Sequence, residues 1–405
     1  MENRVGLGTV LREWGRIGCI GFGGPPAHIA LLRRLCVDRR QWLDAQEFED
    51  AIAACNLLPG PASTELAIFC AWRVRGRPGA VMGGLAFIVP GLICILALSA
   101  LFLAGSPPLW VKGAGAGAGA AVAAVAVQAG WTLLGPSWTR ARASGRARRF
   151  RWAAYLLAGG AAAATIGPWL VLVLLGCGVA ELVQGGVRRH AEAEGEAGAA
   201  EGRARAVAAL PGLAAGAGRV AAGAAAAGGG LAAVAWVAFK VGALSFGGGF
   251  VIIPLMRADA VGRGWMTSAQ FLNAVALGQI TPGPVVQTVS AVGYAAAGVG
   301  GGLLAALVAF SPSFAFVLGG ARYFSALRTS GRAQAFLDGA GPAAIGAILG
   351  AAVLLAGALR QPWQFAVLGG AAVLLLGLRR GVVLTLLAAA VTGLLVALAG
   401  GPLPQ

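Results

Sequence analysis

The sequence predicts an all-α polytopic membrane protein built from two homologous halves, and two observations carry that prediction. Of the 405 residues, 58% are hydrophobic and 11% are charged, which is too apolar a composition for a water-soluble globule of this length. The second observation is an internal repeat in which one pair of motifs occurs twice. Phe22-Gly23-Gly24 and Pro59-Gly60-Pro61 recur as Phe246-Gly247-Gly248 and Pro282-Gly283-Pro284, at offsets of 224 and 223 residues.

This repeat sets the domain organisation. We expect an N-terminal repeat over residues 1–184 and a C-terminal repeat over 207–405. Acidic and basic residues gather between them, so 185–206 is predicted to be a polar, charged linker.

The motifs interrupt apolar segments that are too short to cross a bilayer as ordinary helices. We interpret them as half-helices, because backbone groups that Gly and Pro free in lipid must line a cavity or be buried in protein. These broken or re-entrant half-helices are predicted at 9–21, 45–58, 231–245 and 268–281. Segments long enough to span are predicted at 80–104, 113–134, 153–184, 300–321, 335–357, 363–378 and 381–399.

The distribution of arginine predicts an inverted-topology repeat. Arginine supplies 29 of the 31 basic residues, and in the first half it gathers in loops that we assign to the cytoplasm. The loop Arg73–Arg77 is basic, whereas its counterpart Ala295–Gly300 carries no charge. Inversion needs an odd number of crossings in the first half, which 153–184 supplies as one long tilted span.

Several functional classes are disfavoured. The net charge of +16 follows the positive-inside pattern, so nucleic acid is not an expected partner. The six cysteines show no CxxC spacing and the chain has two histidines, so no disulfide framework, metal or cofactor is predicted. No nucleophile–base pair or Walker A loop indicates an enzyme. Carboxylates are scarce in the apolar segments, which favours an anionic substrate over a cation.

The Phe-Gly-Gly and Pro-Gly-Pro motifs, called break motifs or breaks, have the groups needed to bind a small oxyanion. The glycines leave backbone N–H groups accessible, and a half-helix that begins behind each break points its positive end at the cavity. Gly and Pro that only kink or pack helices are the alternative. The candidate substrate-binding residues are Arg16, Phe22, Gly23, Gly24, His28, Asn56, Pro59, Gly60, Pro61, Lys240, Phe246, Gly247, Gly248, Gln279, Thr281, Pro282, Gly283 and Pro284.

Two basic residues are selected by the repeat. Arg16 falls opposite Lys240 at the 224-residue offset, and each precedes its Phe-Gly-Gly motif by six residues. Lys240 interrupts the otherwise uncharged stretch Leu231–Ser245, where a cation needs a counter-ion, a cavity or water. Snorkelling of the lysine to the membrane surface is the competing interpretation.

Other polar residues have a functional and a structural interpretation. Asn56 matches Gln279 and Thr281 adds a hydroxyl, so these groups either contact substrate or form hydrogen bonds between helices. Glu65 carries a coupling proton or forms an ion pair. His28 binds the anion when protonated, or is a neutral histidine satisfied by the backbone.

The paired motifs resemble those of the chromate ion transporter family in its long, two-domain form. Phe22-Gly23-Gly24-Pro25 and Asn56-Leu57-Leu58-Pro59-Gly60-Pro61, with their second copies, carry the resemblance over nearly the whole chain outside the linker. It implies a multi-pass plasma-membrane exporter that confers chromate resistance and has halves of opposite orientation. Sulfate, a tetrahedral dianion like chromate, stays an alternative substrate.

Mechanism and assembly stay open at this stage. We expect alternating access in which the two halves rock about the oxyanion, driven by membrane potential or ion exchange. A sulfate or general oxyanion carrier, an anion channel and a membrane scaffold are the alternatives. Small residues on the predicted helices lead us to expect a homodimer within the lipid bilayer.

Overall fold

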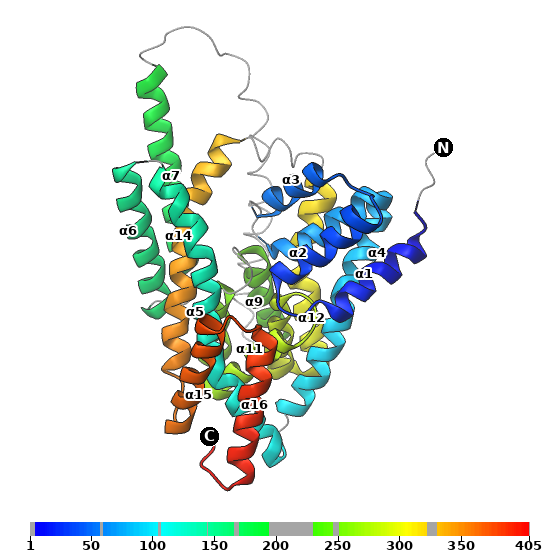
Figure 1. Ribbon diagram of the computed structural model, residues 1–405, viewed down its shortest axis with the longest axis vertical. Coiled ribbons are helices and arrows are strands. Elements are labelled where there is room, and N and C mark those ends of the chain that lie inside the picture. The colour runs from blue at the N-terminus through cyan, green and yellow to red at the C-terminus, as the bar shows by residue number, and fades with distance from the viewer. Residues whose placement is uncertain are drawn as a thin grey trace.

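The protein is described by a computed structural model that covers residues 5–56, 60–103, 107–143, 145–165, 170–193, 230–245, 251–321 and 330–404. These residues form helices and contain no β-strand. Figure 1 shows the helices gathered into two bundles that stand side by side. Their bounds are α1 Leu7–Ile20, α2 Pro25–Arg33, η1 Arg34–Arg39, α3 Ala45–Cys55, α4 Ala62–Phe102, α5 Leu109–Ala143, α6 Arg146–Thr165, α7 Leu170–Ala193, α9 Leu231–Ala243, α10 Ile252–Gly262, α11 Ser268–Ile280, η3 Val285–Gln287, α12 Thr288–Gly320, α14 Gly331–Ala356, α15 Pro362–Ala372, η5 Val373–Gly377 and α16 Val382–Leu398.

Short helices end at the break motifs, and their re-entrant course in a membrane stays a prediction. The helices α1, α3, α9 and α11 occupy the four predicted half-helix segments, and a new helix begins behind each motif. Gly24 is the N-cap of α2 and has a φ of 74°, a value that side chains with a Cβ rarely adopt. Pro25 follows at the first helical position, where its missing N–H costs nothing. The start of α10 at Ile252 follows residues 246–250, which lie outside the described ranges.

The two halves share a helical turn that the motifs alone do not show. Within α4 the chain reverses at Gly76 (φ 66°, ψ −156°), and within α12 it reverses at Gly298 (φ 61°, ψ −155°). A Cβ on Gly84 would lie 2.9 Å from Cγ1 of Ile68, whereas residues this far apart in a straight helix are separated by about 24 Å. Each long helix is therefore a hairpin, and the predicted loops Arg73–Arg77 and Ala295–Gly300 are its turns.

The prediction of one span over 153–184 is wrong, because the structure has two helices there. The helix α6 ends at Thr165 and α7 begins at Leu170. Gly167 and Pro168 lie in the intervening sequence, and both residues disfavour a continuous helix. The inverted topology relied on a single span at this place, so it stays a prediction without that support. The helix α7 continues to Ala193 and so enters the predicted linker.

Each bundle takes helices from both halves. The first bundle, called the core bundle, contains α1–α4 with η1, and α9–α12 with η3. The second, called the frame bundle, contains α5–α7 and α14–α16 with η5. Within the frame bundle, α14 packs against α6 and α7 of the first half, and α5 packs against α15 and α16 of the second half. The last two helices of each half therefore pack against a helix of the other half.

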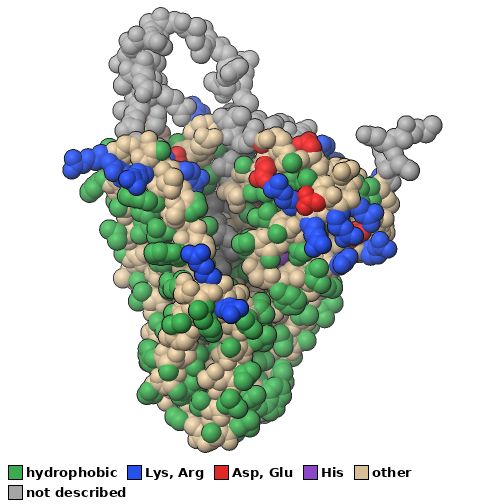
Figure 2. Space-filling model, viewed as in Figure 1, with side chains coloured by type: hydrophobic (Ala, Val, Ile, Leu, Met, Phe, Trp, Pro, Cys, Tyr) green, Lys and Arg blue, Asp and Glu red, His purple; other side chains and the backbone are tan. Residues whose placement is uncertain are grey.

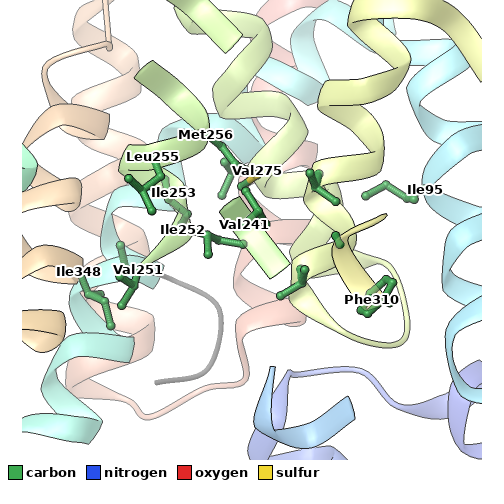
Figure 3. Close-up of a cluster of buried hydrophobic side chains, with 14 of the residues drawn as sticks. Ile95, Val241, Val251, Ile252, Ile253, Leu255, Met256, Val275, Phe310 and Ile348 are labelled. Carbon is green, nitrogen blue, oxygen red and sulfur yellow. The ribbon is translucent and has the colours of Figure 1, made fainter. Parts of the chain in front are cut away.

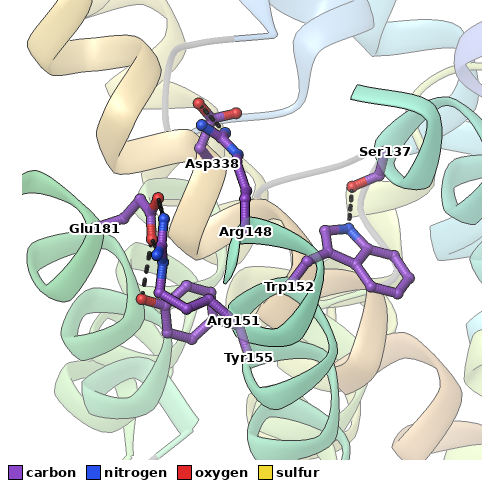
Figure 4. Close-up of polar contacts among 7 residues, drawn as sticks. All are labelled: Ser137, Arg148, Arg151, Trp152, Tyr155, Glu181 and Asp338. Carbon is purple, nitrogen blue, oxygen red and sulfur yellow. Dashed lines mark hydrogen bonds and ion pairs between the residues drawn. The ribbon is translucent and has the colours of Figure 1, made fainter. Parts of the chain in front are cut away.

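Glycines and one polar network hold the frame bundle together. The backbone of Leu156 in α6 lies directly against Gly346 in α14, which leaves no room for a Cβ. Figure 4 shows the polar contacts around this interface. Arg151 donates two 2.9 Å hydrogen bonds to Glu181 of α7, and Arg148 forms an ion pair with Asp338 of α14. The Arg148–Asp338 pair joins the two halves inside one bundle.

Apolar side chains fill the centre of the core bundle. Figure 3 shows Val241 of α9, Ile252 of α10, Val275 of α11 and Phe310 of α12 in one buried cluster. Each of these four side chains is at most 3% exposed. Ile348 of the frame bundle lies beside Val251 in the same view, where α10 packs against α14.

The outer surface is apolar, as expected of a protein embedded in lipid. Large side chains such as Ile93, Trp131 and Leu307 are 64%, 67% and 72% exposed. Among the described helices, α5, α14, the hairpin α4, and η3 with the hairpin α12 are long and apolar enough to cross a membrane. Figure 2 shows Lys and Arg gathered towards the upper end of this face, with hydrophobic side chains covering its lower end. The protein is therefore an integral membrane protein.

Candidate functional site

The break motifs of the two halves meet inside the core bundle. The N–H of Gly283 donates a 2.9 Å hydrogen bond to the carbonyl oxygen of Gly21. A Cβ on Gly24 would lie 3.5 Å from Cγ2 of Val285, so the starts of α2 and η3 are in contact. The first break of one half therefore packs against the second break of the other half.

His28 ties the first break to the start of α4. Its Nε2 lies 2.9 Å from the carbonyl oxygen of Gly21, and its Nδ1 lies 3.2 Å from Oγ of Ser63. A carbonyl only accepts, so Nε2 carries a proton and donates, while the neutral ring accepts from Ser63 at Nδ1. Phe87 packs edge-on with its ring centroid 5.0 Å away. Both nitrogens of His28 are occupied by protein groups, as the structural interpretation of this residue requires.

A second contact between the halves joins the second Pro-Gly-Pro motif to α4. Gln287 donates a 2.6 Å hydrogen bond from Nε2 to the carbonyl oxygen of Ile88 in α4. Gly91, one turn further along α4, lies directly against the carbonyl oxygen of Pro282 and Oε1 of Gln287. Here a glutamine side chain fills the space beside the Pro-Gly-Pro turn.

The corresponding place in the first half contains buried polar groups instead. Thr64 and Glu65 in the first turn of α4, and Ser313 of α12, are completely buried. Among the described residues, their side-chain oxygens have no hydrogen-bond partner. Gly60 lies against Oε1 of Glu65, and Oγ of Ser313 is 3.4 Å from the position of a Cβ on Gly60. We call Thr64, Glu65 and Ser313 the Gly60 cluster.

A cavity of about 910 Å³ extends from the space between the two bundles to Gly60, behind which the cluster is buried. One wall is α3 with Gly60 and Ala62, and the other is formed by α5, α6 and α14. Arg140 and Arg148 line it together with the carboxylates of Glu49 and Asp338. The cavity therefore connects a charged entrance to a break motif.

The matching position in the second half is packed more closely. The helix α11 is the counterpart of α3, and it contacts α5 and α16 of the frame bundle directly. A Cβ on Gly119 of α5 would lie 3.1 Å from the Cβ of Leu272 in α11. A smaller cavity of about 420 Å³ lies beside this contact, lined by Lys112, Gln270 and Asn273 among others.

The two predicted basic ligands do not join the Gly60 cluster. Arg16 is exposed on the surface of α1. Lys240 forms a 2.5 Å ion pair with Asp259 of α10, in which the side chains are 14% and 11% exposed. Lys240 thus has the counter-ion that its apolar segment requires, and its charge is already compensated.

The remaining predicted residues divide between the cavity and the interior. Asn56 lines the large cavity, whereas Gln279 is buried and its Nε2 has no partner among the described residues. Thr281 donates to the carbonyl oxygen of Leu277 in its own helix. Phe22 and Gly23 are exposed, and Gly60, Pro61, Pro282 and Pro284 are buried at the turns. Pro59, Phe246, Gly247 and Gly248 lie outside the described residues.

The sequence analysis missed Ser63, Thr64, Ser313 and Gln287. Ser63 and Thr64 lie two and three residues after the first Pro-Gly-Pro motif, so their position beside a break was available as a signal. Ser313 has no such signal, because it lies in the middle of α12 and reaches Gly60 only through helix packing.

We expect Gly24→Ala to reduce strongly the oxyanion transport that the sequence predicts. Its φ of 74° and ψ of −158° belong to a region populated almost only by glycine, and strain of this kind costs about 1–3 kcal/mol. The change would displace α2 from η3 and separate the two breaks. Uptake of a radiolabelled tetrahedral oxyanion into vesicles, normalised to the amount of folded protein, measures the effect. Gly8→Ala in α1 is the control, because no atom lies within 4 Å of its Cβ position; equal losses in both variants would contradict the prediction.

Comparison with known proteins identifies the family. The family model described as "Chromate transporter" matches residues 8–182 and 232–394, one stretch in each half. A chromate transport protein of Pseudomonas aeruginosa is 32% identical over 333 residues, which cover 82% of this chain and 77% of that relative. A chromate transport protein of Cupriavidus metallidurans is 30% identical over 348 residues, covering 84% and 80%. No solved structure matches. The chain belongs to the chromate transporter family.

Proposed function

We propose that the protein exports chromate by alternating access and thereby confers chromate resistance on the cell. The observation that carries the proposal is the cavity of about 910 Å³ between the bundles, which ends at Gly60 and the start of α4. The identity of the substrate in this proposal is taken from relatives that are named as chromate transport proteins. Transport is a secondary process in this proposal, and the membrane is the plasma membrane.

The internal repeat supports a specific motion. The helices α3 and α11 are counterparts, and so are α14 and α5. On one side α11 packs against α5, whereas on the other side α3 faces α14 across the large cavity. Exchanging these two arrangements would close α3 onto α14 and open α11 from α5. The moving units are then the core and frame bundles, rather than the two halves that the sequence analysis expects to rock.

Orientation follows from the positive-inside pattern. Arg140 and Arg148 at the large cavity belong to the basic segment that the sequence analysis assigns to the cytoplasm. The described arrangement then corresponds to a state open to the cytoplasm, in which an anion enters beside arginine side chains and meets the start of α4. The positive end of a helix favours bound anions.

The membrane potential is sufficient to drive export of a dianion. An inside-negative potential of about 100 mV contributes about 2.3 kcal/mol for each charge, or about 4.6 kcal/mol for chromate. That free energy corresponds to a concentration ratio of about three decades. Export therefore needs no direct use of ATP.

The proposal is tested by radiolabelled chromate flux in proteoliposomes that contain the purified chain. The potential is clamped at several values and unlabelled sulfate is added in parallel. We expect saturable chromate movement that increases with the potential and is inhibited weakly by sulfate. Strong inhibition by sulfate would favour a general oxyanion carrier, conductance without saturation would favour a channel, and absence of flux would refute chromate transport.

A further inference from the structure

We propose that Glu65 carries a proton whenever the anion is bound, so that one proton moves through the protein with each chromate. This inference rests on the proposed function and adds a coupled ion and a carrier residue to the same site. It starts from the Gly60 cluster, in which a carboxyl group and two hydroxyl groups are buried without partners in the described part of the chain.

Burial indicates that Glu65 is neutral in this arrangement. Its side chain is completely buried, and no Lys or Arg among the described residues forms an ion pair with it. An ionised carboxylate in such a place costs several kcal/mol unless a cation or hydrogen-bond donors compensate it. Protonation removes this cost. The ion-pair interpretation of Glu65 finds no partner in the described residues.

A neutral Glu65 suits an anion site, and an ionised one does not. The acid has one O–H that must donate. Two further donors are the hydroxyl of Ser313, which lies 3.4 Å from the Cβ position of Gly60, and the buried hydroxyl of Thr64, the residue before Glu65. All three can donate to the oxygens of a tetrahedral oxyanion at the start of α4. An ionised Glu65 would repel a dianion bound beside it. Binding of the anion and binding of the proton therefore favour each other.

The surroundings favour a proton over a metal cation. Glu65 lies in the first turn of α4, where the positive end of the helix disfavours a bound cation. The titratable groups facing the cluster are the buried thiol of Cys55 on α3 and the neutral His28 of α2, which contacts the neighbouring Ser63. From α12 the cluster is faced by Ser313, which is not charged. Among the residues that the structure describes, no charged neighbour competes with Glu65 for the proton.

The proposed cycle involves proton exchange and no covalent chemistry. Glu65 takes a proton from water in the cavity open to the cytoplasm and donates a hydrogen bond to the incoming chromate. After the bundles move, chromate leaves and Glu65 releases the proton to water on the other side. The net charge moved is then −1 for each chromate, instead of −2.

The experiment measures chromate flux and luminal pH together in proteoliposomes at alkaline pH, where chromate is the dianion. At a clamped potential of 100 mV and no initial pH gradient, we expect an equilibrium chromate ratio of about 50-fold, against about 2,500-fold for an uncoupled dianion. A pH gradient alone should drive chromate movement at zero potential. These two measurements on the unaltered protein need no variant to fold.

Glu65→Gln provides the matched test of the residue, because the amide keeps a donor but cannot exchange a proton. We expect the chromate flux that remains in this variant to be insensitive to a pH gradient and to be accompanied by no proton movement. Glu49→Gln is the control, since this exposed carboxylate lines the same cavity and pairs with Arg33 at the surface. It should keep proton movement.

The outcomes separate the two proposals. Potential-driven chromate flux without proton movement would overturn the proton inference and leave chromate export intact. Persistent proton movement in Glu65→Gln would overturn the assignment of the residue. Dependence on a sodium gradient in place of a pH gradient would replace the proton by Na⁺ and also overturn the inference. Absence of any chromate flux would refute the proposed function itself.

Discussion

A disulfide that joins α5 to α11 through the paired substitutions Gly119→Cys and Leu272→Cys is expected to stop chromate transport. The Cβ positions of these residues lie 3.1 Å apart, near the separation of about 3.5–4.5 Å found in disulfides. The bond would hold the core bundle against the frame bundle on the side where they touch. If the bundles must separate there during the cycle, flux falls to background and returns when a reductant opens the disulfide.

A second cross-link distinguishes the motion of bundles from the motion of halves. Arg148 and Asp338 form an ion pair between α6 and α14, so they join the two halves within the frame bundle. Cysteines at these two positions, bridged by a short bifunctional maleimide, should leave flux within about twofold of the same variant without the reagent. The exposed Cys19 and Cys94 are replaced by alanine in both experiments.

The two cross-links together decide the mechanism. Positions 148 and 338 line the cavity, so a monofunctional maleimide at the same cysteines is the control for blocking it. If the bridge stops transport and the monofunctional reagent does not, the halves move against each other and the two-bundle motion is wrong. If the disulfide between positions 119 and 272 forms and transport continues, the contact between α5 and α11 does not open and alternating access at this interface is wrong.

Lys240→Ala is expected to destabilise the protein by about 3 kcal/mol, because it leaves Asp259 buried without its main counter-ion. The Asp259 carboxylate lies 2.5 Å from Nζ of Lys240, and its weaker contact with Arg263 is 3.6 Å long and more exposed. Thermal unfolding of the purified protein, followed by loss of the monodisperse folded species, measures the change. The double variant Lys240→Ala with Asp259→Ala should recover most of the stability and the transport.

This recovery separates a structural role of Lys240 from substrate binding. If Lys240 contacted chromate, removing Asp259 would not restore transport. Arg16→Ala is the matched comparison, because Arg16 occupies the equivalent position in the first half but is exposed. We expect it to change stability by less than about 0.5 kcal/mol. A strong loss of transport in Arg16→Ala at normal protein levels would support the predicted role of both basic residues in binding the substrate.

The sequence predicted what depends on local chemistry. Short helices end at the Phe-Gly-Gly and Pro-Gly-Pro motifs, where Gly and Pro occur together and disfavour a continuous helix, and the first turns of new helices follow them. The repeat placed matching loops at 73–77 and 295–300, and the structure has matching turns there, at Gly76 and Gly298. The single span at 153–184 failed because apolar composition alone does not distinguish one long helix from two.

The candidate site was predicted in part. The breaks, His28 and Glu65 were selected from residue types that are costly in an apolar segment, and the structure brings the first break, His28 and the second Pro-Gly-Pro together. Lys240 was selected by the same reasoning, but its partner Asp259 lies on a helix beyond a break. Helical periodicity predicts which residues share a face of one helix. It does not predict which residues face each other across a break, because the sequence does not give the direction in which the next helix leaves the motif.

The sequence by itself therefore determined that the chain is a helical membrane protein with a repeated pair of motifs and a short helix before each of them, because those properties follow from composition and from Gly and Pro at fixed positions. Only the tertiary structure decided that each half lends its last two helices to the other, and that Ser313 lies beside Gly60 and Glu65. The faces of α5 and α14 are rich in Gly and Ala and accept many close neighbours, so their partners are selected by the packing of the whole molecule.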